Sequence, residues 1–288
     1  MKSEFLKLRY SRLTWIIGVA LLVMMALGHA IVIGIPYFIP WMISMNEVIP
    51  NFTSADQMTD AQLSLLSFEN STAQWQVADI AGSSTGLIGA VTAGVVLLSA
   101  LSVAAEYRHD SISLTVQLEP RRTRALLEKL AALAIVTTLL AAALMVLSSL
   151  ALWVGTVVAG VPLAMPLGEL VLTWLGSWVV LLLMSFLGFG VGLLLRGQLA
   201  SIAVLLCLAL LESVLRPVST LLFGGPTVFS ALPFGLAYDV TGHANILTGQ
   251  SIPGFSPEAA MLMLLIWAVV IVLGAGVVFQ RRDVAGRA

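Results

Sequence analysis

The chain has 288 residues, of which 59% are hydrophobic and only 10% carry a charge. Ordinary soluble domains carry roughly 25% charged residues, so the composition excludes a typical soluble enzyme and a disordered protein. With Cys207 as the single cysteine, intrachain disulfides are excluded as well. These numbers indicate a polytopic membrane protein that forms one lipid-embedded unit.

Six stretches are long enough and poor enough in charge to cross a bilayer, which takes about 20 apolar residues per helix. They predict membrane-spanning helices over residues 14–39, 78–105, 128–159, 169–195, 198–216 and 259–280. The fifth is the least clear, because Glu212 and Arg216 fall near its end and Pro217 follows at once. We therefore expect an all-α membrane protein, with one six-span transmembrane domain over residues 1–288.

The placement of the basic residues predicts the orientation. In a six-span arrangement, all but one of the 14 basic residues fall on the same side of the membrane, and the exception is Arg216. Because Lys and Arg favour the cytoplasmic side, both termini are expected to be cytoplasmic. A chain with five or seven spans would scatter these bases across both sides.

Residues 217–257 form an apolar region that prolines and glycines interrupt repeatedly. The region is too broken for a span and too apolar for a solvated loop. Since irregular backbone at membrane depth needs cover from protein or from a water-filled cavity, we expect short outer re-entrant helices before the last span.

Charged residues inside a membrane are candidates for function, so Glu212 and Arg216 are candidates for the lining of a substrate path. Spaced four residues apart, they share a helix face and can also pair with each other. A self-neutralising pair at the helix end is the favoured interpretation, because Pro217 follows directly. Asp79, at the predicted start of the second span, suits the positive end of a helix dipole.

Small residues recur every four positions in the second span and predict a helix-packing seam there: Gly82, Gly86, Ala90 and Gly94. This spacing lets another helix approach closely. Gly188 and Gly192 repeat the spacing in the fourth span. The seam joins either two copies of the chain or two helices of one chain, and for the fourth span the second interpretation is favoured.

Signatures of catalysis are missing from the sequence. There is no GxxxxGK[ST] phosphate loop, no HExxH, no GxSxG and no cysteine pair. The three histidines, His29, His109 and His243, lie in different regions and are not expected to share a metal ion. No catalytic residue, metal or bound cofactor is therefore expected in this chain.

The segment between the second and third spans, from Glu106 to Lys129, mixes acidic, basic and apolar residues. This mixture is more typical of a docking surface for a protein than of a simple lipid anchor. Its apolar residues from Ile112 to Leu118 alternate with period two, which by itself favours a strand, and Pro120 suits the start of a helix.

This segment resembles the inner loop of ABC-2 type transporter permeases, the membrane subunits of a class of ATP-driven exporters. The matching residues are Glu106, Arg108, Pro120, Arg121 and Arg122. Asp110 and Ser111 stand where the family usually has Gly-Thr. The ending Phe279–Asp283 and the six-span plan with both ends inside are also similar.

The resemblance implies a transport subunit without enzymatic activity, in which an inner coupling helix sits in a cleft of a separate ABC-type ATPase. ATP and Mg²⁺ would bind to that partner, and a second permease copy, identical or related, would complete the transporter in a bacterial cell membrane. No nucleic-acid partner is expected. The residues implied in coupling to the ATPase are Glu106, Arg108, Asp110, Pro120, Arg121 and Arg122.

Glu106 is further expected to close the second span by pairing with a nearby base. The nearly charge-free membrane interior favours a hydrophobic or amphipathic substrate, such as a drug, a peptide or a lipid.

Two other functional classes of membrane protein are considered. An ion- or proton-coupled secondary transporter would show charges at mid-membrane, where only Glu212 is found. An intramembrane enzyme would need catalytic side chains at one depth, and the sequence shows none.

Overall fold

A computed structural model of the chain describes residues 11–48, 67–82, 89–108, 122–241 and 254–281. Within these ranges all regular elements are helices. Their bounds are α2 Arg12–Val48, α4 Ser71–Ala78, α5 Ala90–Arg108, α7 Arg122–Ala159, α8 Leu167–Leu195, α9 Gln198–Phe223, η2 Val228–Ala231, α10 Pro233–Thr241 and α11 Pro257–Arg281.

Six of these helices are long and apolar enough to cross a membrane: α2, α5, α7, α8, α9 and α11. This confirms the prediction of an all-α membrane protein with six spans. Their outward faces carry large apolar side chains, among them Trp153, Leu199 and Leu221. Exposed apolar surface of this extent is typical of a surface that contacts lipid rather than water.

Helix α8 forms the centre of the bundle and packs against α5, α7, α10 and α11. Gly188 and Gly192 set its distance from α5, because a Cβ atom at either position would overlap the backbone of Val96 or Ala100. The small residues of the fourth span therefore serve packing within one chain, as expected from the sequence.

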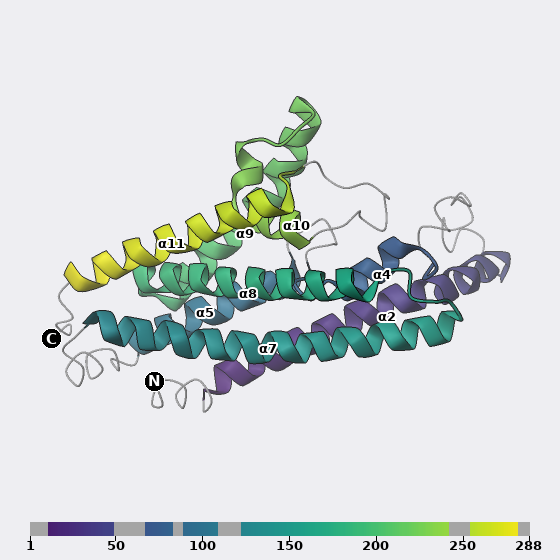
Figure 1. Cartoon of the computed structure of the whole chain (residues 1–288), viewed down its shortest axis with the longest axis horizontal. Coiled ribbons are helices and arrows are strands. Elements are labelled where there is room, and N and C mark those ends of the chain that lie inside the picture. Colours follow the sequence, from purple (N-terminus) through teal and green to yellow (C-terminus); the bar gives the residue numbers. More distant parts are fainter. Residues whose placement is uncertain (1–10, 49–66, 83–88, 109–121, 242–253, 282–288) are drawn as a thin grey trace.

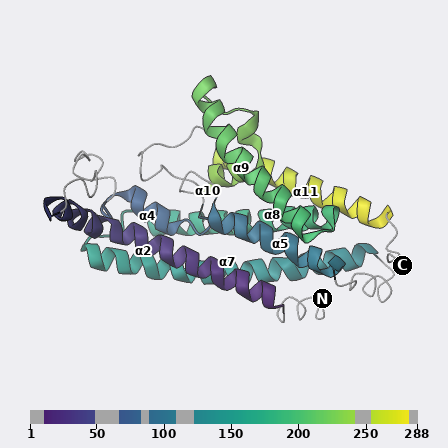
Figure 2. The same ribbon diagram turned by 180° about the vertical axis from the view of Figure 1, so that it is seen from behind.

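Several helix ends meet at one end of the bundle. The start of α2, the end of α5, the start of α7 and the end of α11 lie together, on the left of Figure 1 and on the right of Figure 2. Helix α4 lies toward the opposite end. Helix α7, with 38 residues, is about 57 Å long and extends well beyond a hydrocarbon core of about 30 Å.

The second span begins at Ala90 and not at residue 78, which corrects the prediction. Helix α4 ends at Ala78, and a turn follows in which the N–H of Ala81 donates to Asp79 Oδ1 at 2.9 Å. Gly82 has φ +67°, a left-handed conformation outside any helix. Asp79 thus lies at the end of α4 and not at the start of a span.

The predicted ladder of small residues is broken for the same reason. Gly82 is not part of a helix, and Gly86 lies outside the described residues. Ala90 is the first residue of α5, and Gly94 receives the side chain of Leu21 from α2. Gly94 therefore serves contact within one chain.

The fifth span is also longer than predicted. Helix α9 continues through Pro217 to Phe223, so Arg216 lies inside the helix and not at its end. A proline cannot donate the N–H that would bond the carbonyl of Ser213, but the packing of the neighbouring η2 and α10 holds the helix together beyond it. These two short helices precede the last span, in the region where short outer helices were predicted.

Candidate functional site: paired helix ends, a buried charge cluster and two cavities

An ion pair joins the ends of α5 and α7. The Lys129 ammonium donates to both carboxylate oxygens of Glu106, at 2.6 and 2.5 Å. The two side chains are only 9% and 18% exposed, so little water screens the interaction. Lys129 is thus the base that closes the end of the second span.

The remaining residues implied in coupling lie between Glu106 and Lys129 in the chain. Arg108 is the last residue of α5 and Arg122 the first of α7. Asp110, Pro120 and Arg121, together with the predicted coupling helix, lie outside the described residues. The Arg196 guanidinium lies 5.3 Å from the centre of the Tyr107 ring, a cation–π contact that ties the end of α8 to the end of α5.

A second cluster of charges lies where α9 meets α10. The carboxylate of Glu212 accepts the N–H groups of Phe234, at 3.2 Å, and of Gly235. These are among the first N–H groups of α10, which have no partner within their own helix. Glu212 therefore caps a neighbouring helix, where the helix dipole stabilises its negative charge.

Arg216 completes the cluster from the same face of α9. One guanidinium nitrogen donates to the Gly235 carbonyl at 2.5 Å, and another pairs with Asp239. The ring centre of Tyr238 lies 4.9 Å from the guanidinium carbon. Arg216 and Glu212 thus bond to α10 and do not form the self-neutralising pair that their spacing favoured.

Asp239 extends the cluster to the last span. Its second carboxylate oxygen accepts the N–H of Phe255, just before α11, at 3.0 Å. Burial raises the pKa of the Asp239 carboxyl, and the nearby Arg216 cation opposes this shift. We call Glu212, Arg216 and Asp239 the α10 cluster, because together they fix α10 between α9 and α11.

The α10 cluster was only partly predictable. Glu212 and Arg216 stood out as charges in a span, but they line neither of the two cavities described here. Asp239 and Lys129 gave no comparable signal, since their partners lie 23 residues away in the chain in each case. Among the residues that the structure describes, no group of three His, Cys, Asp or Glu side chains could hold a metal ion.

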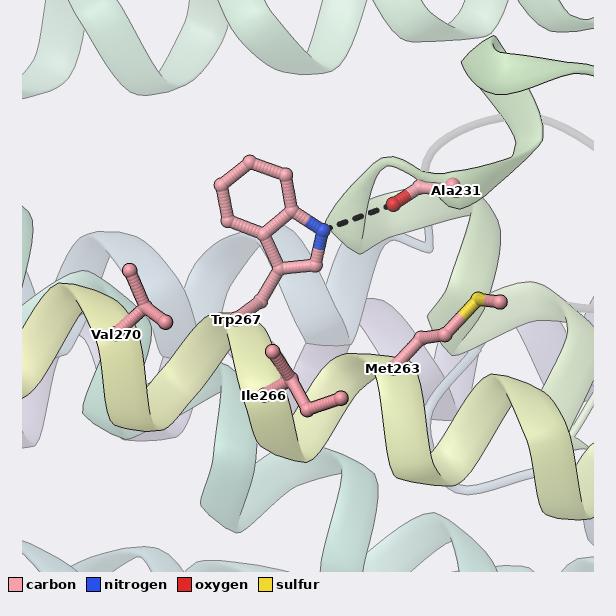
Figure 3. Close-up of a pocket in the computed structure, with 5 residues that line it drawn as sticks. All are labelled: Ala231, Met263, Ile266, Trp267 and Val270. Atoms are coloured by element: carbon pink, nitrogen blue, oxygen red, sulfur yellow. Dashed lines mark hydrogen bonds between the residues drawn. The ribbon is translucent and has the colours of Figure 1, made fainter.

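An apolar pocket lies on α11 next to η2. Ala231, Met263, Ile266, Trp267 and Val270 line it, and Trp267 donates its indole N–H to the Ala231 carbonyl at 2.9 Å (Figure 3). The hydrogen bond fixes the indole, and the side chains around it offer only apolar surface. Such a pocket suits an alkyl chain.

A smaller cavity lies between α2, the turn after α4 and the start of α5. Its walls are largely apolar, but His29, Gln76 and Asp79 also face it. We call it the His29 cavity. His29 lies within α2, one of the six candidate spans, and an ionisable side chain inside a span is a candidate for function.

The comparisons with known proteins give a family but no activity. A search of curated proteins finds no match to the chain. A family model with the description "Protein of unknown function (DUF2705)" matches residues 52–285, which include every described helix from α4 to α11. Since this match covers well over half of the sequence, the chain belongs to the DUF2705 family of proteins of unknown function.

Proposed function

We propose that this multi-pass membrane protein is the permease subunit of an ATP-driven ABC transporter of the exporter class. It acts with a separate ABC-type ATPase, which binds ATP and Mg²⁺, and with a second permease copy. It has no catalytic residue of its own. Its location is the cell membrane of a bacterium, with the paired helix ends on the cytoplasmic side.

The observation that carries the proposal is the Glu106–Lys129 ion pair. Residues 109–121, which include Pro120 and Arg121 of the resemblance to a coupling segment, connect the two helices that this pair joins. Because the pair holds the ends of α5 and α7 together, a force applied to the segment between them moves both helices as one body.

The bundle offers a route by which this movement reaches the rest of the protein. Helix α5 contacts the backbone of α8 closely at Gly188 and Gly192. Closely packed helices move as a unit, since packed interfaces resist gradual deformation. In the proposed mechanism, closure of the ATPase dimer displaces α5 and α7, and α8 transmits the displacement to α10 and α11.

The substrate class follows from the surfaces available. The pocket at Trp267 is apolar and faces the membrane side of α11. A hydrophobic or amphipathic substrate, such as a drug, a peptide or a lipid, fits such a surface better than a small ion does. The export direction is proposed from the resemblance alone.

The test is co-purification of an ATPase from gently solubilised membranes, with ATP hydrolysis assayed on the eluate. The wild-type chain should bring down an ABC-type ATPase, and the variant Arg121→Glu/Arg122→Glu should lose it while inserting normally. Arg281→Glu is the matched control, because Arg281 is an exposed base at the same end of the bundle. A chain that elutes alone and without ATPase activity would contradict the proposal.

A secondary transporter coupled to ions or protons is the second candidate. Buried ionisable side chains inside spans, His29 in α2 and Glu212 in α9, are the observation that favours it. Transport that a protonophore abolishes but that continues without ATP would support this candidate over the ABC permease.

A further inference from the structure

The His29 cavity has a volume of about 150 Å³. Met25, Val32 and Val91 belong to its apolar wall, and His29, Gln76 and Asp79 form its polar part. An engineered cavity of about 150 Å³ in a lysozyme binds benzene, so the volume suits a body of about the size of a phenyl ring. The cavity is therefore large enough for a ligand and not only for a single water molecule.

His29 supplies the first sign of a ligand. Its side chain is only 6% exposed, and its Nδ1 atom has no hydrogen-bond partner within the described residues. A buried polar atom without a partner costs about 1–3 kcal/mol. A histidine in the middle of an apolar helix is thus poorly explained by packing and well explained by a ligand that bonds to its ring.

Asp79 gives the cavity its charge. The carboxylate is 1% exposed, and its Oδ1 atom accepts the N–H of Ala81 at 2.9 Å and the hydroxyl of Ser177 at 3.4 Å. These bonds hold the carboxylate at the cavity wall. A negative charge in a poorly solvated site attracts a cation far more strongly than it would in water.

The polar groups are matched to one kind of ligand. A carboxylate only accepts hydrogen bonds, an unprotonated imidazole nitrogen accepts one, and the Gln76 amide oxygen accepts as well. A protonated amine has three N–H donors and a positive charge, so it complements all three groups. The apolar wall complements a hydrocarbon body attached to that amine.

We propose that the His29 cavity binds a small organic ammonium compound with a compact apolar body. Asp79 binds the ammonium group, His29 Nδ1 accepts one of its N–H bonds, and the apolar wall holds the body. The site lies at the start of α5, and the 19 residues of that helix place it about 28 Å from the paired helix ends. This proposal is independent of the transport function, because binding needs no ATPase partner.

The experiment measures binding to the purified full chain by isothermal titration calorimetry. Benzylamine is the probe, and benzyl alcohol is a neutral control of nearly the same shape. Benzylamine should bind with a dissociation constant at least about tenfold lower, because its bonds to the site are charge-assisted. Equal affinity for the two compounds would overturn the proposal.

Three variants locate the site. Asp79→Asn should remove the preference for benzylamine over benzyl alcohol, whereas Glu169→Gln, which removes an exposed carboxylate elsewhere, should keep it. Gly28→Leu covers the case in which Asp79→Asn does not fold. Gly28 lines the cavity, and a Cβ atom there meets nothing within 4 Å, so the backbone tolerates a side chain, and leucine should narrow the cavity and weaken the binding of benzylamine. Unchanged benzylamine binding in Gly28→Leu would also overturn the proposal.

Discussion

Arg216 of α9 forms an ion pair with Asp239 of α10, and the two side chains are only 6% and 3% exposed. The pair does not stand alone, because Asp239 also accepts the N–H of Phe255 and Glu212 caps the start of α10. Arg216 thus provides the positive charge of the α10 cluster, which connects α9, α10 and the residues just before α11. In a low-dielectric interior, removal of one charged member of such a cluster leaves its partners buried without compensation.

Removal of the arginine should therefore be costly. The substitution Arg216→Gln leaves Asp239 buried without its cation, and loss of one partner of a buried ion pair costs about 3–5 kcal/mol. The free energy of unfolding in mixed micelles, followed by circular dichroism, measures the change. Arg124→Gln is the control, because Arg124 pairs with Glu128 at an exposed site and its loss should leave the unfolding midpoint unchanged. Equal effects of the two substitutions would contradict the role of the cluster.

The contact between α5 and α8 gives a prediction on packing. In Gly188→Ala, the new methyl group would overlap the carbonyl of Val96, and a backbone atom cannot move aside alone. The two helices must separate slightly, which costs about 1–3 kcal/mol. Gly274→Ala is the control, since a Cβ atom there meets nothing within 4 Å, and it should gain up to about 1 kcal/mol from helix propensity. A Gly188→Ala protein as stable as the wild type would show that α5 and α8 are not held this closely.

The six spans could be predicted from the sequence because lipid imposes one simple pattern, a long apolar stretch without charges. The start of the second span could not. The charge-free run from Ile80 to Ala105 is typical of one helix. A local hydrogen bond from Ala81 to Asp79, a tertiary one from Ser177 to Asp79 and the left-handed Gly82 form a turn there instead. The run Gly82-Ser-Ser-Thr-Gly86 was the local signal that could have marked the break.

The contacts of the α10 cluster could likewise be predicted only in part from the sequence. Spacing alone placed Glu212 and Arg216 on one helix face, which is correct, and favoured contact between them, which is wrong. Their partners come from α10, and nothing in the local sequence identifies which of the acidic residues outside the span will pair with Arg216. Pro217 predicted a helix end, but the neighbouring short helices maintain α9 beyond it.

Gln74 links α4 to the connection between α7 and α8. Its buried side chain donates to the carbonyls of Phe68 and Pro162, at 3.1 and 3.2 Å, and accepts the N–H of Ala164 at 2.7 Å. Gln74→Leu removes all three bonds and should destabilise this end of the bundle by about 1–3 kcal/mol or more. Hydrogen exchange at the Ala164 amide should become faster.

Ser149→Ala is the matched control for Gln74→Leu. The Ser149 hydroxyl is exposed and bonds only to the Val146 carbonyl of its own helix, so its loss should leave exchange at Ala164 unchanged. Wild-type exchange in Gln74→Leu would mean that the connection is held by other contacts.

Variants of the Glu106–Lys129 pair distinguish its structural role, which is to join α5 to α7, from a direct role of Glu106 in contact with the ATPase. Glu106→Lys alone places two positive groups together and should lower the free energy of unfolding by about 1.5–3 kcal/mol, the range for hydrogen bonds to charged groups. The double reversal Glu106→Lys/Lys129→Glu restores an ion pair of opposite orientation and should recover at least half of that loss, as a double-mutant cycle would show.

ATP hydrolysis by the co-purified ATPase then gives the second readout for these proteins. If the pair only joins α5 to α7, the double reversal restores hydrolysis along with stability, since a joined pair of helix ends is all that transmission requires. If Glu106 itself contacts the ATPase, stability returns while substrate-stimulated hydrolysis stays low. Because the Glu106 and Lys129 side chains are largely buried against each other, we expect the first outcome, with both properties restored together.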